Sequence, residues 1–133
     1  MLAGAGITSV AQLKRLGSVR AYAKVRATGA RPTLNLLWAL EGALTGLPWQ
    51  VVAREHRLSL LLALGHGDAM LSGMTRPFPQ TMREISRVLG PKPGGVPFGI
   101  HMMVGKTQTT FMADTTINER PSAVDLAHIA KET

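Results

Sequence analysis

Apolar residues recur every three or four positions through the first half of the chain, a spacing typical of helices. The first such segment carries Val10, Leu13 and Leu16. Ser9 precedes it, and Gln12 follows three residues later, so that the pair has the form of a capping box. The pattern therefore predicts a helix that begins directly after Ser9.

Glycine and proline divide the rest of the first half into further short helices. Gly17 is suited to end the first helix, because glycine adopts positive φ at little cost. A second helix follows it, a third begins near Pro32 and ends at Gly46, and a fourth opens at Pro48. Four helices joined by turns of a few residues predict a compact all-α module over residues 1–65.

The apolar residues of the second half follow a different pattern. A short apolar run at 68–73 predicts a buried strand, and 75–89 predicts a helix with apolar residues on one side. Residues 98–104 and 109–113 predict two strands joined by a link short enough for a hairpin. A last helix is expected from Pro121 onward. The order β-α-β-β-α indicates an incomplete α/β lobe over residues 66–133, so that the whole chain is an α+β composite.

Composition narrows the class of protein. The 133 residues include no cysteine, which excludes a disulfide framework and agrees with a cytoplasmic location. No apolar run is long enough to cross a bilayer, and the N-terminus lacks the features of a signal peptide. We therefore expect a soluble cytoplasmic protein without membrane contact.

The positive charge is concentrated in the first half. Up to Gly65 there are eight lysine and arginine residues against two glutamates, a net charge of +6, out of +7 for the chain. Any nucleic-acid contact is therefore expected there, with Lys14, Arg15, Arg20 and Lys24 as candidates. The alternative is that these side chains form an ordinary solvated face. Trp38 and Trp49 recur among leucines and are expected in the core rather than as base-stacking platforms.

The first half also resembles a known family. The strings GITSVAQLKRLGSVRAYAKVRATG and LNLLWALEGALTGLPW, within residues 3–64, resemble the C-terminal domain of the TfoX/Sxy regulators of DNA transformation (competence). The resemblance implies a helical, helix-hairpin-helix-like domain. It further implies a role in binding nucleic acid or docking another protein, and no catalysis.

The second half resembles a different family. The strings GDAMLSGMTRPFPQTMREISRVLGPKPGG and FGIHMMVGKTQTTFMADTTINERPSAVDLAHIA are similar to the phosphate acetyl/butyryltransferase-like C-terminal domain of bacterial NADP-type malic enzymes. The resemblance implies an acyltransferase fold that responds to acetyl-CoA and forms homo-oligomers. The family domain is longer than this half, so a truncated lobe is expected.

The second resemblance implies a site for acyl-CoA or phosphate. The matching positions are Ser72, Thr75, Arg76, Thr81, Asp114, Thr115 and Asn118. Hydroxyl and guanidinium donors beside a helix start are suited to hold a phosphate group. The alternative is that Thr75 caps a helix and that Asp114 and Asn118 build a turn.

Other motifs carry no chemistry. Gly105-Lys106-Thr107 lacks the glycine five residues before Gly105 that a P-loop requires, because Ile100 occupies that position. The four histidines show no metal-ligand spacing, so no metal site and no catalytic residue are predicted.

The leading hypothesis is a non-catalytic fusion of the two modules. The alternatives are a regulatory domain that binds acetyl-CoA or phosphate, and a module that binds nucleic acid or protein through the basic half.

Overall fold

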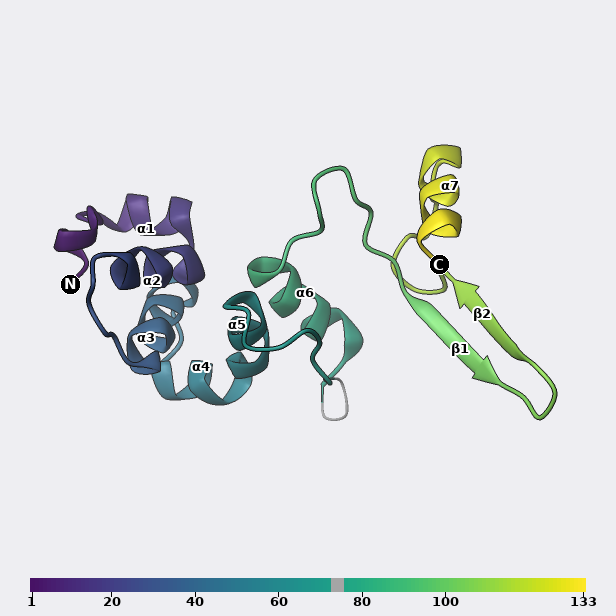
Figure 1. Ribbon diagram of the computed structural model, residues 1–133, viewed down its shortest axis with the longest axis horizontal. Coiled ribbons are helices and arrows are strands. Elements are labelled where there is room, and N and C mark those ends of the chain that lie inside the picture. The colour runs from purple at the N-terminus through teal and green to yellow at the C-terminus, as the bar shows by residue number, and fades with distance from the viewer. Residues whose placement is uncertain (73–75) are drawn as a thin grey trace. The chain divides into compact units, whose positions relative to one another are not determined.

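A computed structural model describes residues 1–72 and 76–133 (Figure 1). The chain forms two compact units, Met1–Gly90 and Pro91–Thr133, and each is described by itself. In their described residues, the first unit is helical and the second contains a two-stranded sheet and a helix. The predicted α+β class is confirmed.

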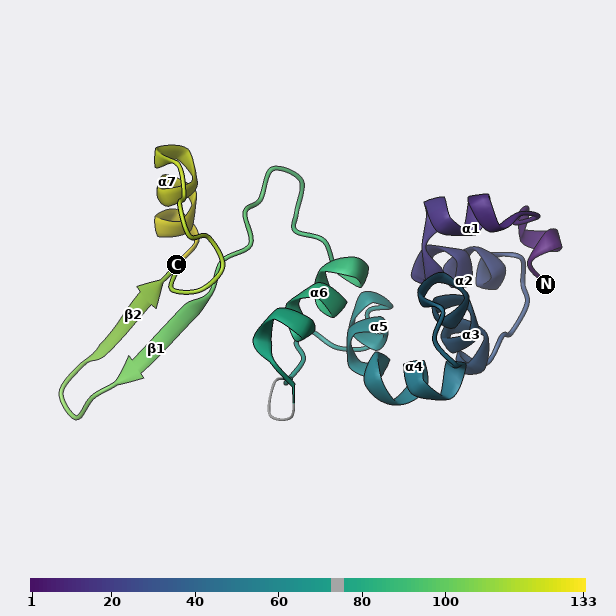
Figure 2. The same ribbon diagram turned by 180° about the vertical axis from the view of Figure 1, so that it is seen from behind.

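The first unit begins with a short 3-10 helix at Ala3–Ala5. Its α-helices are α1 (Val10–Leu16), α2 (Ser18–Ala27), α3 (Leu34–Thr45), α4 (Trp49–Glu55), α5 (Arg57–Ala63) and α6 (Phe78–Val88) (Figure 2). Neighbouring helices pack in chain order, with α2 against α3, α3 against α4, and α5 against α6. Helix α6 therefore belongs to the helical unit, although it lies beyond residue 65. The predicted division of the chain at residue 65 stays a prediction.

The prediction of four helices up to residue 65 is wrong, because the structure has five there. The expected fourth helix is divided at His56 into α4 and α5. His56 has φ −105° and ψ 4°, which interrupts the helical path. Local apolar spacing did not signal this break, since His56 is held by side chains from distant segments.

The predicted start and end of α1 are confirmed. The amide of Gln12 donates to Ser9 Oγ at 3.2 Å, and the Ser9 amide donates back to Gln12 Oε1 at 3.3 Å. Together these bonds satisfy two backbone donors that a helix start leaves open. Gly17 ends the helix with φ +76°, a value that a residue with a Cβ adopts only with strain.

The core of the first unit collects residues from α1 to α5. Leu37 and Trp38 from α3 pack with Val25, Val52 and Leu60, and Val88 from α6 lies against this cluster. Trp38 is buried as predicted, whereas the prediction for Trp49 is wrong, because this residue at the start of α4 is 44% exposed.

Gly42 sets the closeness of α3 to the turn before α4. A Cβ at this position would lie 2.6 Å from the carbonyl oxygen of Leu47, a distance that backbone atoms do not tolerate. Only glycine therefore allows α3 and the 46–48 turn to approach as they do.

The second unit contains β1 (Ile100–Val104), β2 (Thr109–Ala113) and α7 (Ala123–Glu132). The two strands are antiparallel, with Met102 opposite Phe111, so the predicted hairpin is confirmed. Ser122 and Asp125 form a capping box that begins α7. Every residue of both strands is exposed within the described chain.

Two details of the predicted β-α-β-β-α order are corrected. Residues 68–72 contain no strand, and the rest of the predicted strand lies outside the described residues. Among the described residues of the first unit, no strand is present with which this apolar run could pair. The helix expected over 75–89 begins at Phe78, because the extended Pro77 precedes it.

Among the described residues, no helix has the length and apolar character needed to cross a bilayer.

Candidate functional site

A buried carboxylate organises the interior of the first unit. Glu41 on α3 leaves only 3% of its side chain exposed. The hydroxyl of Ser18 donates to Glu41 Oε2 at 2.6 Å, and Arg87 Nη2 on α6 lies 2.8 Å from Oε1. The contact with Arg87 is an ion pair rather than a well-aligned hydrogen bond, since no donor is directed at Oε1. Ser18, 23 positions earlier in the sequence, thus donates to this carboxylate, and Arg87, 46 positions later, balances its charge.

His56 lies beside this ion pair, at the junction of α4 and α5. Its Nδ1 is 2.9 Å from Arg87 Nη2, and its Nε2 is 3.9 Å from Glu84 Oε1. An arginine can only donate, so Nδ1 accepts and the neutral ring carries its proton on Nε2. Burial lowers the pKa of His56, and the Arg87 charge lowers it further against the opposing effect of Glu84 and Glu41.

The stability of the first unit is expected to depend on this histidine between about pH 5 and 7. Unfolded His56 takes up a proton near pH 6.5, whereas the folded side chain resists protonation. The unfolded state therefore binds more protons in this window, and the free energy of unfolding should fall as the pH drops below 6.5. Denaturant unfolding followed at pH 7.5, 6.5 and 5.5 measures the effect.

The His56→Gln variant should show a smaller loss of stability over the same pH range. His66→Gln is the matched control, because His66 is an exposed histidine of the same unit. If His56→Gln and His66→Gln change the pH dependence equally, the buried ring is not the responsible group.

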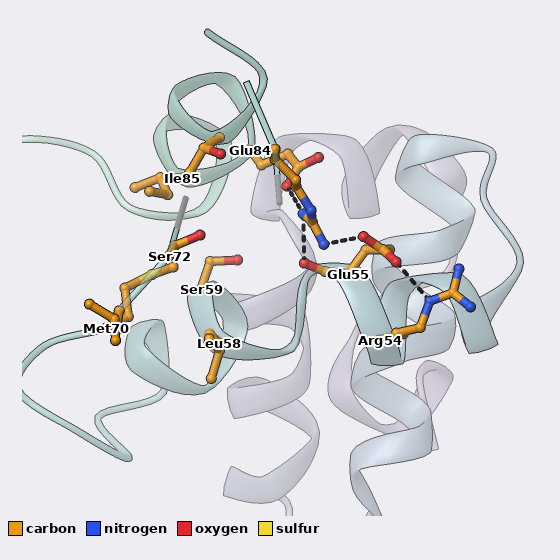
Figure 3. Close-up of a pocket in the computed structure, with 11 residues that line it drawn as sticks. Arg54, Glu55, Leu58, Ser59, Met70, Ser72, Glu84 and Ile85 are labelled. Carbon is orange, nitrogen blue, oxygen red and sulfur yellow. Dashed lines mark hydrogen bonds and ion pairs between the residues drawn. The ribbon is translucent and has the colours of Figure 1, made fainter. Parts of the chain in front are cut away.

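A pocket of about 270 Å³ lies beside α5 and α6 (Figure 3). Polar groups converge on it from three segments of the chain, with apolar side chains between them. Its lining consists of Arg54, Glu55, Leu58, Ser59, Met70, Leu71, Ser72, Arg76, Thr81, Glu84 and Ile85. The pocket therefore combines hydroxyl donors, two arginines and two glutamates.

Arg76 is fixed in this pocket by two carboxylates. Its Nη1 donates to Glu84 Oε2 at 2.6 Å and to the backbone carbonyl of Glu55 at 3.1 Å. Its Nη2 donates to Glu55 Oε2. Glu55 also accepts from Arg54 Nε at 2.7 Å, as Figure 3 shows. The hydrogen bond from Arg54 is the main cause that lowers the pKa of Glu55, so this carboxylate is charged at neutral pH.

The structure brings three of the predicted phosphate-site residues together. Ser72, Arg76 and Thr81 all line the pocket. Thr75 lies outside the described residues, so its predicted role has no description here. The other predicted residues, Asp114, Thr115 and Asn118, belong to the second unit.

Asp114 holds the loop that follows β2. Its Oδ1 accepts from the amides of Gly99, Thr116 and Ile117 at 3.1–3.2 Å. Its Oδ2 accepts from the Asn118 amide at 2.8 Å. Desolvation raises the pKa of Asp114, but these four amide donors outweigh it and hold the pKa well below its usual range.

The neighbouring polar residues also serve this loop. Asn118 Nδ2 donates to the carbonyl of Pro97 at 2.9 Å and to Asp114 Oδ2 at 2.6 Å. Thr115 Oγ1 lies 2.6 Å from Nδ1 of His101 on β1. These contacts join the segment before β1 to the segment after β2, which agrees with the alternative that Asp114 and Asn118 build a turn.

The predicted basic candidates lie on the surface of the first unit. Lys14 and Arg15 occupy the last turn of α1, and Arg20 and Lys24 lie one turn apart on α2. All four are exposed. No carboxylate of the described residues lies within ion-pair distance of them.

Within the described ranges, no group of three or more histidine, aspartate or glutamate side chains is suited to hold a metal ion.

Sequence reasoning missed the residues that shape the pocket and the buried cluster. The missed residues matched no motif, because most of their partners lie in other segments of the chain. They are Glu41, Glu55, His56, Glu84 and Arg87. A buried position for Glu41 was detectable in one respect: it lies among the apolar residues of α3, at Leu40-Glu41-Gly42.

Comparisons with known proteins confirm both resemblances. The model of the TfoX C-terminal domain matches residues 1–64, and the model of phosphate acetyl/butaryl transferase matches residues 50–133. The two matches overlap over residues 50–64, which contain α5 and most of α4.

Curated relatives match the second part of the chain. The NADP-dependent malic enzyme of Rhizobium meliloti (strain 1021) is 33% identical over 79 residues, which are 59% of this chain and 10% of that protein. The probable NADP-dependent malic enzyme of Rickettsia prowazekii (strain Madrid E) is 34% identical over 73 residues, 55% of this chain and 10% of that protein.

The match thus spans about a tenth of the length of these relatives. No solved structure matches the chain significantly. Residues 1–64 are similar to the TfoX C-terminal domain, and the match over residues 50–133 covers more than half of the chain. On that match, the chain belongs to the phosphate acetyl/butaryl transferase family.

Proposed function

We propose that the chain is a non-catalytic protein whose acyltransferase-type part binds the phosphate group of a ligand in the pocket beside α5 and α6. The observation that carries this proposal is the convergence of Ser72, Arg76 and Thr81 on one cavity. All three lie in the stretch that matches the phosphate acetyl/butaryl transferase family. Hydroxyl and guanidinium groups are the side chains best suited to donate to phosphate oxygens.

The size of the pocket favours a small ligand or the phosphate end of a larger one. Its volume of about 270 Å³ is slightly below the roughly 300–1,000 Å³ that ligand pockets span. Inorganic phosphate or an acyl phosphate fits within it, whereas acetyl-CoA would place only its phosphate groups there. We therefore propose phosphate or acetyl-CoA as ligand, bound through phosphate.

The proposal of a non-catalytic role rests on how the polar residues are used. The Asp114 carboxylate already accepts hydrogen bonds on both oxygens, and Asn118 donates to it and to Pro97. A catalytic acid or base needs a titratable group near neutral pH. The lowered pKa of Asp114 is unsuited to that task.

Binding of inorganic phosphate is expected to raise the unfolding temperature of the wild-type chain. A ligand at 100 times its dissociation constant stabilises the folded state by about 2.7 kcal/mol. Differential scanning fluorimetry with 0–20 mM phosphate, at ionic strength held constant with NaCl, measures the shift. Ser72→Ala and Thr81→Val each remove one hydroxyl donor and should reduce the shift. An equal shift with NaCl alone would contradict binding at this pocket.

A second candidate function is nucleic-acid binding through α1 and α2. The specific observation is that Lys14, Arg15, Arg20 and Lys24 are exposed without a carboxylate partner among the described residues. In this proposal the four side chains contact the phosphate backbone. The helix-hairpin-helix character, a competence role and protein docking, all implied by the similarity to the TfoX C-terminal domain, stay proposals with it.

Nucleic-acid affinity is expected to fall about 100-fold between 50 and 200 mM salt, if four phosphate contacts are made. Fluorescence anisotropy with a labelled 20-base-pair duplex measures it. Replacing Lys14, Arg15, Arg20 and Lys24 by glutamine should abolish the binding. The matched control replaces four cations of the second unit by glutamine, namely Lys92, Lys106, Arg120 and Lys131. Equal losses of affinity in both quadruple variants would show that binding depends only on the net charge of the chain and not on these four positions.

We further propose that the second unit associates with its copies in a cytoplasmic setting. The hairpin exposes Ile100, Met102, Met103, Phe111 and Met112. A two-stranded hairpin is marginally stable without further burial. Association between copies would cover these side chains, and the mass in solution tests it.

A further inference from the structure

The phosphate pocket carries no net positive charge. Its lining contains Arg54 and Arg76, and also Glu55 and Glu84. Both carboxylates are directed at Arg76, the strongest phosphate donor in the pocket. The two carboxylates neutralise the charge of this guanidinium, so a phosphate group can pair with its full charge only after one carboxylate leaves it.

The two carboxylates differ in how easily they can leave. The side chain of Glu84 is 17% exposed, and it also lies 3.9 Å from the buried His56 ring. The side chain of Glu55 is 30% exposed, and it has a second partner in Arg54, whose own side chain is 76% exposed. Glu55 can therefore turn toward solvent and stay paired with Arg54. Glu84 is less exposed and has Arg76 as its cation, so its carboxylate would lose that partner on leaving.

We propose that Glu55 is an internal competitor for the phosphate pocket. In the free protein its carboxylate occupies Arg76, and a phosphate group replaces it there while Glu55 stays paired with Arg54. This regulation rests on the proposed function, because it concerns the same pocket. Glu55 lies on α4, within the stretch that both family models match. A residue that lies in the overlap of the two family matches thus sets the phosphate affinity of the pocket.

The test measures the dissociation constant of inorganic phosphate by isothermal titration calorimetry on the full chain at pH 7.5 and constant ionic strength. Glu55→Gln removes the competing charge and should bind phosphate about tenfold more tightly than wild type. Glu55→Asp shortens the side chain by one methylene and should give a smaller gain. Glu119→Gln removes one exposed negative charge from the second unit and is expected to leave the affinity unchanged.

A further variant tests whether the gain in phosphate affinity depends on Arg76. Combining Glu55→Gln with Arg76→Gln should abolish the gain, because the released guanidinium is then missing. Equal affinities of wild type and Glu55→Gln would overturn the competitor role and leave phosphate binding intact. An equal gain in Glu119→Gln would also overturn it. Failure of both wild type and Glu55→Gln to bind phosphate would overturn the proposed function together with this inference.

Discussion

Replacing Leu60 by alanine is expected to lower the free energy of unfolding of the first unit by about 3 kcal/mol. Leu60 on α5 is fully buried and belongs to the same cluster as Leu37 and Val52. The substitution removes three buried carbon atoms and leaves a cavity that the surrounding helices fill only in part. Urea unfolding followed by circular dichroism at 222 nm measures the loss.

The matched control is Leu58→Ala on the same helix. The Leu58 side chain is 51% exposed, so truncation should cost less than about 1 kcal/mol. The comparison holds helix, residue type and substitution constant and varies only burial. Equal losses in the two variants would mean that α5 does not pack against the core as described.

Replacing Arg87 by alanine is expected to destabilise the first unit by about 2 kcal/mol. Arg87 is the cation beside the buried Glu41 carboxylate, and it also donates to His56. Its loss leaves Glu41 with Ser18 as its hydrogen-bond donor. The expected cost is below the 3–5 kcal/mol typical of fully buried pairs, because 41% of the Arg87 side chain is exposed and water can enter.

Two further variants separate charge from packing. Arg83→Ala removes an exposed arginine from the same helix and should change stability by less than about 0.5 kcal/mol. Adding Glu41→Gln to Arg87→Ala removes the unpaired charge and should restore part of the lost stability. A double variant less stable than Arg87→Ala alone would show that the carboxylate is not the source of the cost. Chemical unfolding under identical conditions compares all four proteins.

These predictions concern a unit in which both family similarities meet. Ser18 and Glu41 lie within the match to the TfoX C-terminal domain, whereas Arg87 lies within the match to phosphate acetyl/butaryl transferase. Their side chains form one cluster around the buried Glu41 carboxylate. The end of the TfoX C-terminal match at residue 64 therefore does not coincide with a break in packing, and α6 is part of the helical unit.

Local features of the fold were determined by the sequence alone. The capping box of Ser9 and Gln12, the end of α1 at Gly17 and the β1–β2 hairpin all formed as predicted. Each depends on residues a few positions apart, whose spacing and backbone preferences act before any distant contact is made. The two family resemblances were also readable in the chain itself.

The tertiary structure decided what these local rules leave open. It divided the expected fourth helix at His56, left residues 68–72 without a strand and placed α6 against α5. It also gave Arg76 and Glu41 their charged partners. Burial, pairing of charges and strand pairing depend on groups that are distant in sequence and near in space, and a one-dimensional pattern does not contain those distances.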